Sequence, residues 1–136
     1  MCGIIVLTHG GFGSNDMISE HEVATVVSSL KENYSKWVTV PRPENHKAAR
    51  DLGMSSKAIL HYICQHLSPQ NYVDGPLKDT SQHGYSGDVW IFGLTIRDIE
   101  CYLKVQRQTD WDCWISIHES RHSIHYFFVD SRRTEI

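Results

Sequence analysis

The chain has 136 residues, of which 40% are hydrophobic and 21% are charged, and its formal net charge is −3. This size suits a single domain with one hydrophobic core and leaves no room for a second domain. The balance of charge excludes a strongly basic nucleic-acid binder, so any RNA contact has to come from a local basic patch. Partial protonation of the nine histidines near pH 6 moves the net charge toward zero.

The sequence contains no signal for export. Its longest apolar run, Ile4–Leu7, is too short to span a membrane or to form the apolar region of a signal peptide. The four cysteines, Cys2, Cys64, Cys101 and Cys113, form no C-x-x-C pair. We interpret them as reduced thiols of a cytoplasmic protein, although Cys101 and Cys113 fall on neighbouring predicted strands and could face each other.

Residues 1–18 are expected to form a leader, either a short strand or a flexible segment, and residues 19–136 a single α+β domain. The first predicted helix begins near Ser19, which has capping-box spacing to Glu22. Apolar residues then recur at three- and four-residue intervals, which puts them on one helix face: Val23, Val26, Val27, Leu30 and Tyr34. That face is expected to meet the core.

Two further helices are predicted before the strands. One runs from Glu44 to Leu52, with Pro43 at its start and Gly53 as a left-handed cap. The other starts at Ser55 or Ser56 and ends before Pro69, with an apolar stripe of Ile59, Leu60, Ile63 and Leu67. His61 and His66 lie off this stripe, so they are expected to be solvated.

Residues 72–86 are rich in Gly, Asp, Ser and Pro and show no apolar period, so a long loop is predicted. The period then changes to two, which predicts strands. Turn-like residues such as Gly93-Leu94 and 108–110 separate these strands, which are Val89–Phe92, Ile99–Gln106, Trp111–His118 and His125–Val129. Helices followed by strands predict an α+β fold with N-terminal helices packed on a mainly antiparallel sheet. Trp90 and Phe92 are expected in the core.

The segment His118–His122 matches H-E-x-x-H, in which two histidines one helical turn apart bind zinc and the glutamate activates water. The residues before it alternate and are β-branched, which favours a strand. On a strand His118 and His122 would lie about 13 Å apart. A zinc hydrolase that uses His118, Glu119 and His122, with His125 as a further ligand, is therefore kept as an alternative.

Two patterns near the N-terminus point to other chemistry. Met1–Ile4 resembles the start of class II glutamine amidotransferases, in which removal of the methionine exposes a nucleophilic cysteine. Gly3–Gly10 resembles the first strand of mannose-type phosphotransferase A components, whose histidine carries phosphate. No downstream motif of either family follows, so a short β-prone or flexible leader is the simpler interpretation.

The longest resemblance covers residues 20–128 and is carried by the order and spacing of four segments: Gly75–Asp79, Gly87–Gly93, Glu100–Val105 and Ile115–Glu119. Together they resemble the MqsR-like branch of bacterial type II toxin–antitoxin toxins, which are ribonucleases of RelE-like fold. The resemblance implies an mRNA endoribonuclease in the cytoplasm, acting in a sequence- or ribosome-directed manner. Its partners would be mRNA and a cognate antitoxin protein. It implies no cofactor.

In that family the Tyr-x-Lys strand and the end of the last strand lie on the active-site side, which carries over to Tyr102 and His118. Lys104 is predicted as a third catalytic residue. Cleaving RNA with its own 2′-hydroxyl needs a base, cations at the phosphate and an acid. His118 can serve as base or acid, and Tyr102 and Lys104 share one strand face, where they can contact a phosphate. The best-known toxins have lysine at the position of His118.

Substrate-binding positions are less regular. The family places a basic residue just after the step that corresponds to Asn71-Tyr72, whereas here the nearest one, Lys78, is displaced into the predicted loop. Tyr72 and Lys78 are predicted to contact substrate, and Arg107 and Arg121 to supply a patch that binds phosphates. A non-catalytic binding protein on the same fold is the other alternative.

Overall fold

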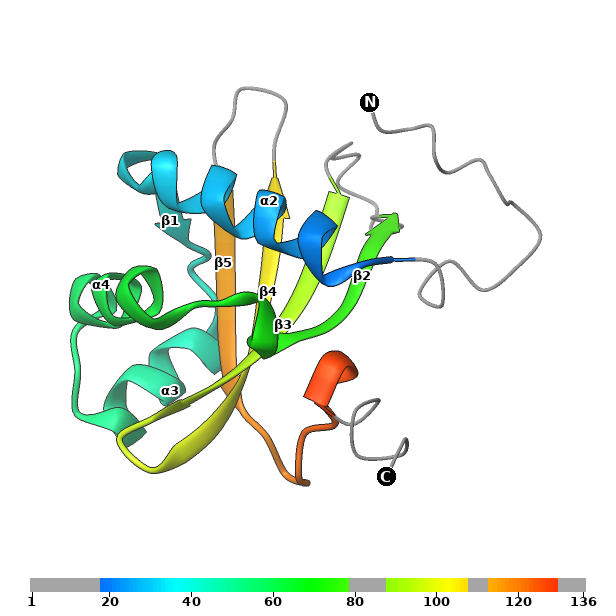
Figure 1. Cartoon of the computed structure of the whole chain (residues 1–136). Helices are drawn as coiled ribbons and strands as arrows, with labels where there is room; N and C mark the ends of the chain where they lie inside the picture. Colours follow the sequence, from blue (N-terminus) through cyan, green and yellow to red (C-terminus); the bar gives the residue numbers. More distant parts are fainter. Residues whose placement is uncertain (1–17, 79–87, 108–112, 130–136) are drawn as a thin grey trace.

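The computed structural model describes residues 18–78, 88–107 and 113–129. It confirms an α+β fold in which helices precede most of the strands (Figure 1). The short 3-10 helices η2 (Tyr34–Lys36) and η3 (Pro69–Asn71) link larger elements. In chain order these are α2 (Glu20–Glu32), β1 (Trp37–Thr39), α3 (Pro43–Leu52), α4 (Ser56–His66), β2 (Tyr72–Lys78), β3 (Asp88–Ile96), β4 (Ile99–Arg107) and β5 (Cys113–Glu119).

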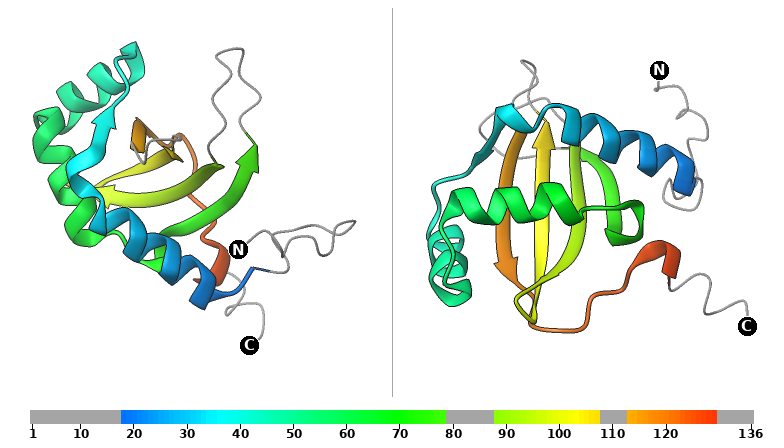
Figure 2. Two further views of the ribbon diagram at one scale, coloured as in Figure 1. Left: turned by 90° about the horizontal axis from the view of Figure 1, so that it is seen from above. Right: turned by 60° about the vertical axis from the view of Figure 1, so that its left-hand side comes forward.

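The strands form one five-stranded sheet in the order β1-β5-β4-β3-β2. β1 pairs with β5 in parallel, and all other neighbours are antiparallel. Helices α2 and α4 cross one face of the sheet (Figure 2), and α3 packs against β5. The helices therefore cover one face and one edge of the sheet.

Local signals at the ends of the helices explain why they begin and end where they do. The Ser19 backbone N–H donates to Glu22 Oε1 (2.8 Å), and the Glu22 N–H donates to Ser19 Oγ (3.1 Å), which confirms the predicted capping box. Gly53 ends α3 with φ of 66°, a left-handed conformation in which glycine is least strained. Ser55 Oγ accepts the Ala58 N–H (3.1 Å) and so begins α4.

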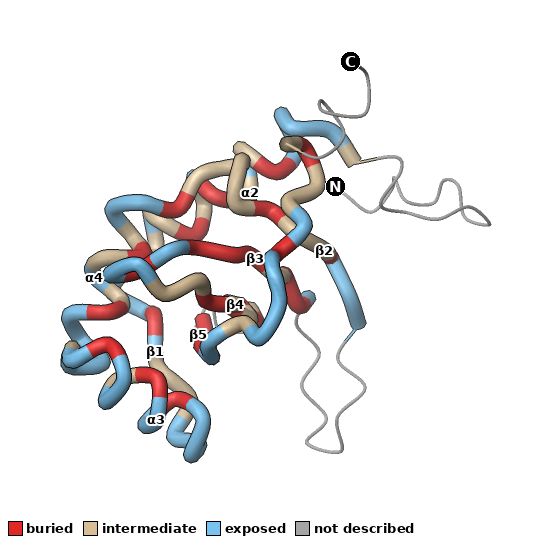
Figure 3. The backbone as a smooth tube through the Cα atoms, turned by 90° about the horizontal axis from the view of Figure 1, so that it is seen from below, coloured by how far each residue is buried: buried red, intermediate tan, exposed pale blue. Residues whose placement is uncertain are grey.

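The core lies between the helices and one face of the sheet, as the buried segments in Figure 3 indicate. Helix α2 contributes Val23, Val27 and Leu30 to it, as predicted. The sheet contributes alternate residues, among them Trp90 and Phe92, which confirms their expected place in the core. The largest side chains that are almost fully buried are Tyr72, Phe92, Ile63, Leu67 and Ile96.

The structure corrects the prediction for residues 72–86. Residues 72–78 form β2 rather than a loop, and the rest of that range lies outside the described residues. β2 pairs with β3 through two register shifts and contains Gly75, at φ 117°, followed by Pro76. An edge strand tolerates a proline and such irregularities, but they erase the period of two that reveals a strand in a sequence.

Two turn and strand assignments near the end of the sheet were also wrong. Gly93-Leu94 is not a turn, because β3 continues to Ile96 and the chain reverses at Arg97 and Asp98, whose φ angles are 50° and 67°. Such left-handed pairs suit two-residue hairpins. Residues 125–129 do not form a strand, since residues 127–129 are helical. β1 was not predicted.

Candidate active site

The face of β4 and β5 that lies away from the helices carries a short ladder of polar and aromatic side chains, of which Gln106 is buried. Across these strands Tyr102 pairs with His118, Lys104 with Ser116, and Gln106 with Trp114. Because side chains alternate along a strand, these residues point away from the helices, whereas Leu103 and Val105 point into the core. The sheet therefore presents its polar ladder on the face opposite α2 and α4.

The structure brings together the three predicted catalytic residues. The rings of Tyr102 and His118 lie 5.6 Å apart between centroids, with an interplanar angle of 34°. Lys104 is two residues further along β4, a step of about 7 Å on the same face. Tyr102 and Lys104 are half-buried and His118 is exposed. A phosphate placed above this face can be reached from an imidazole, a phenol and an ammonium group.

A segment that follows β5, residues 120–129, places Ile124 and Tyr126 over Gly93, which lies on the same face. Its course is fixed by Glu100: the Ser120 N–H donates to the Glu100 carbonyl (2.8 Å), the Ile124 N–H to Oε1 (3.3 Å) and the Tyr126 hydroxyl to Oε2 (3.2 Å). Burial, helped by Glu100, raises the pKa of Tyr126 to about 12, so this phenol stays protonated near neutral pH. We call residues 120–129 the C-terminal segment.

The position of the C-terminal segment was not predicted from the sequence, although one residue, Gly93, indicates it. Gly93 lies within β3 directly opposite Tyr102. A Cβ at Gly93 would meet Tyr126 Cε1 at 2.8 Å and Ile124 Cδ1 at 2.9 Å. Glycine inside a strand often marks a close approach by another part of the chain. Here it leaves space for the C-terminal segment.

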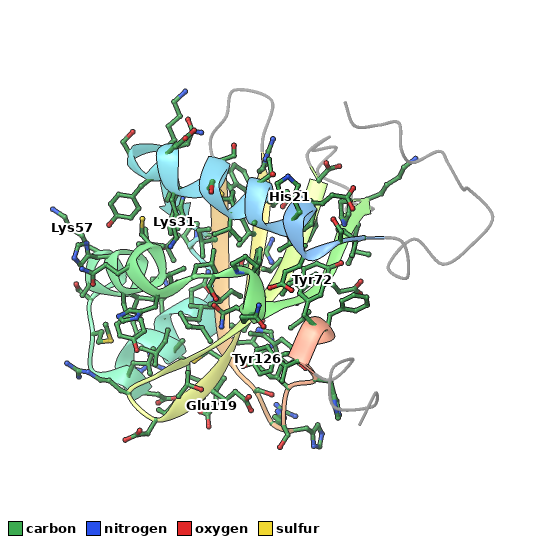
Figure 4. The ribbon with its side chains drawn as sticks, viewed as in Figure 1. His21, Lys31, Lys57, Tyr72, Glu119 and Tyr126 are labelled. Atoms are coloured by element: carbon green, nitrogen blue, oxygen red, sulfur yellow. The ribbon has the colours of Figure 1, made fainter. Side chains whose placement is uncertain are left out.

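Tyr72 occupies a different environment from the one expected of a substrate-binding residue. It is fully buried (0% exposed), and its ring packs against Phe127 and Phe128, with centroids 5.5 Å and 5.4 Å away. Its hydroxyl donates to the Gly75 carbonyl, and burial raises its pKa above the ordinary value. In Figure 4 it lies near α2 and β2, and Tyr126 and Glu119 are labelled below it. Tyr72 thus has no surface for RNA and instead anchors the C-terminal segment.

The predicted basic residues are not gathered at the ladder. Lys78 is exposed and pairs with Asp88 on β3. Asp88 precedes Gly93 by five residues, so Lys78 lies about 17 Å along the strand from the level of Gly93. Arg107 is on the helix side of the sheet, where it lines a small cavity of about 10 Å³ beside Trp37 and Cys113. Arg121 is exposed just beyond β5. Of the three cations, Arg121 is nearest to His118 along the chain.

The H-E-x-x-H segment does not adopt the helix that zinc hydrolases need. His118 belongs to β5, as predicted, β5 continues to Glu119, and residues 120–122 are irregular. Neighbouring strand residues face opposite sides of a sheet, so His118 and Glu119 cannot act on one water molecule. Across residues 18–78, 88–107 and 113–129, no group of three or more His, Cys, Asp or Glu side chains is placed to hold a metal ion.

The remaining candidates play no part in this site. Cys2 and the Gly3–Gly10 pattern lie outside the described residues. Cys101 pairs with Glu119 and Cys113 with Arg107, so the two cysteines do not face each other. Both are buried free thiols, and burial raises their pKa values to about 11 and about 12, which makes them poor nucleophiles. His61 and His66 are exposed, as expected.

Comparison of the chain with protein-family models, with curated proteins and with solved structures finds no match. None of the helices in the described part of the chain is long and apolar enough to cross a membrane.

Proposed function

We propose that this protein is an endoribonuclease toxin that cuts mRNA by metal-independent transesterification and is neutralised by a cognate antitoxin. The observation that carries the proposal is the pairing of Tyr102 with His118 on the sheet face away from the helices, with Lys104 on the same strand. Side chains that share one face of adjacent strands can act together on one phosphate. The resemblance to MqsR-like toxins supports the choice of substrate.

Each side chain has a chemical role in this reaction. A base takes the proton of the 2′-hydroxyl, the 2′-oxygen attacks phosphorus, and the bond from phosphorus to the 5′-oxygen breaks as an acid protonates that oxygen. The products are a 2′,3′-cyclic phosphate and a 5′-hydroxyl. His118 takes or gives a proton, while the Tyr102 hydroxyl donates to a phosphate oxygen and Lys104 offsets the charge that builds there.

The degree of burial of each of the three side chains fits its role. His118 is exposed, so it can exchange its proton with solvent between turnovers. Tyr102 and Lys104 are half-buried, which limits the rotamers they can adopt and so holds their polar ends above the sheet. Positioning and charge stabilisation by such groups provide much of the rate enhancement in phosphoryl chemistry.

Induced expression in bacteria, with His118→Ala as the inactive-site control, tests the function. We expect the wild-type chain to arrest growth and to fragment mRNA, the control to do neither, and co-expression of a small DNA-binding protein encoded next to the gene to restore growth. Growth arrest without RNA fragmentation would favour a non-catalytic binding protein. Equal RNA fragmentation by both chains would contradict the proposed site.

A further inference from the structure

The C-terminal segment places one more aromatic side chain beside the ladder. Gly93 is the β3 partner of Tyr102, and the ring of Tyr126 occupies the space directly above Gly93. Directly paired residues on adjacent strands have Cβ atoms about 5 Å apart, so Tyr126 lies next to Tyr102. The pKa of the Tyr126 phenol is raised first by burial and then by Glu100, and Tyr102 adds a smaller electrostatic effect in the same direction. Tyr102 is therefore flanked by Tyr126 on one side and His118 on the other.

The segment is anchored on both sides of Tyr126. Before it, Ile124 is buried and donates to Glu100. After it, Phe127 and Phe128 pack on the buried ring of Tyr72. Tyr126 itself donates to Glu100, two residues from Tyr102 on the same strand face. These contacts tie the ring to β4, the strand that carries the candidate site.

We propose that Tyr126 is a positioning residue for Tyr102. The Tyr126 ring, which lies above Gly93, confines the Tyr102 side chain beside His118. This inference rests on the proposed function, in which Tyr102 and His118 act on one phosphate. Removing the Tyr126 ring opens space above Gly93, into which the Tyr102 side chain can rotate away from His118. Displacement of a catalytic group by about 1 Å costs about a hundredfold in rate. The hydroxyl of Tyr126 acts indirectly, by holding its own ring in place through Glu100.

Steady-state cleavage of a short single-stranded RNA by purified variants tests the role. We expect Tyr126→Ala to lower kcat by about ten- to a hundredfold with little change in KM, because a group needed in the transition state is misplaced. Tyr126→Phe keeps the ring and should retain most of the activity. Tyr34→Ala is the matched control, since it removes a half-buried tyrosine from the helix side of the protein and should leave kcat unchanged.

Gly93→Ala provides an independent variant in case Tyr126→Ala does not fold. Its Cβ would displace the Tyr126 and Ile124 side chains while leaving both residues present. It should lower kcat in the same manner as Tyr126→Ala. Full activity of a folded Tyr126→Ala or Gly93→Ala protein would overturn the positioning role.

Ring-proton NMR of the protein without RNA separates this inference from the proposed function. Tyr126→Ala should shift the ring signals of Tyr102 and His118, because the neighbouring ring is lost and Tyr102 gains freedom. Tyr34→Ala should leave them in place. If the wild-type chain does not cleave RNA, the proposed function fails, but the NMR comparison still tests whether Tyr126 confines Tyr102 beside His118. Unchanged Tyr102 and His118 signals would overturn it.

Discussion

Replacing Asn45 by alanine should lower the free energy of unfolding more than the loss of a polar side chain usually does. Asn45 is 3% exposed, and its side chain completes the edge of β5 where β1 has ended. Its Nδ2 donates to the Val40 carbonyl, and its Oδ1 accepts the Ile117 N–H at 2.7 Å. Alanine leaves the buried Ile117 N–H and the half-buried Val40 carbonyl without this partner. The Val40 carbonyl keeps the Arg42 N–H (2.9 Å), so only the Ile117 N–H is left unsatisfied. The unsatisfied donor should cost about 1–3 kcal/mol and the lost bond to Val40 about 1 kcal/mol, a total of about 2–4 kcal/mol.

Urea denaturation followed by circular dichroism measures this loss, with Asn33→Ala as the matched control. The side-chain amide of Asn33 donates to the Ser29 carbonyl at 2.9 Å, and the loss of this bond should cost about 1 kcal/mol. Hydrogen exchange at the Ile117 amide should also become much faster in Asn45→Ala than in the control. Equal stability losses in the two variants, with slow exchange at Ile117, would refute the assignment of Asn45 as the partner that completes the β5 edge.

Three further outcomes are expected. His118→Ala and Tyr102→Phe should each lower RNA cleavage about 10²–10⁴-fold while shifting the free energy of unfolding by only about 0.5 kcal/mol, as cleavage assays and melts will show. Ser19→Ala should lower the free energy of unfolding by about 1 kcal/mol without changing RNA cleavage, and a loss of cleavage would contradict this. The pKa values of Cys101 and Cys113 are raised by burial from 9.0 to about 11 and about 12, so the contribution of the two thiols to stability should be fully present below pH 9 and be lost as the pH rises toward 12. Urea titrations should show a flatter decline for Cys113→Ala, and an unchanged slope would exclude the thiol as its cause.

Features set by neighbouring residues could be predicted from the sequence. Ser19 and Glu22 are three residues apart and complete a capping box between themselves, and Gly53 ends α3 by its own backbone conformation. Tyr102 and Lys104 share a face because alternation along a strand is local. The α+β class followed from the same periodicities.

Features that depend on distant contacts could not be predicted. Asn45 meets Ile117 across 72 residues, and Tyr126 meets Glu100 across 26. The aromatic residues near the C-terminus are half-buried or buried because they pack on Tyr72 and Gly93, and their composition alone resembled a strand. The burial of Tyr72 has the same origin. Tertiary packing therefore overrides local preference in the part of the chain that borders the candidate site.

The most direct test is cleavage of a single-stranded RNA by the purified protein in excess chelator, followed by analysis of the new ends. We expect cleavage that persists with chelator, gives 2′,3′-cyclic phosphate and 5′-hydroxyl ends, fails when the scissile nucleotide lacks its 2′-hydroxyl, and is lost in His118→Ala. These results would place the chemistry on side chains of the sheet face. Intact RNA, or cleavage that stops with chelator and returns with zinc, would contradict the account.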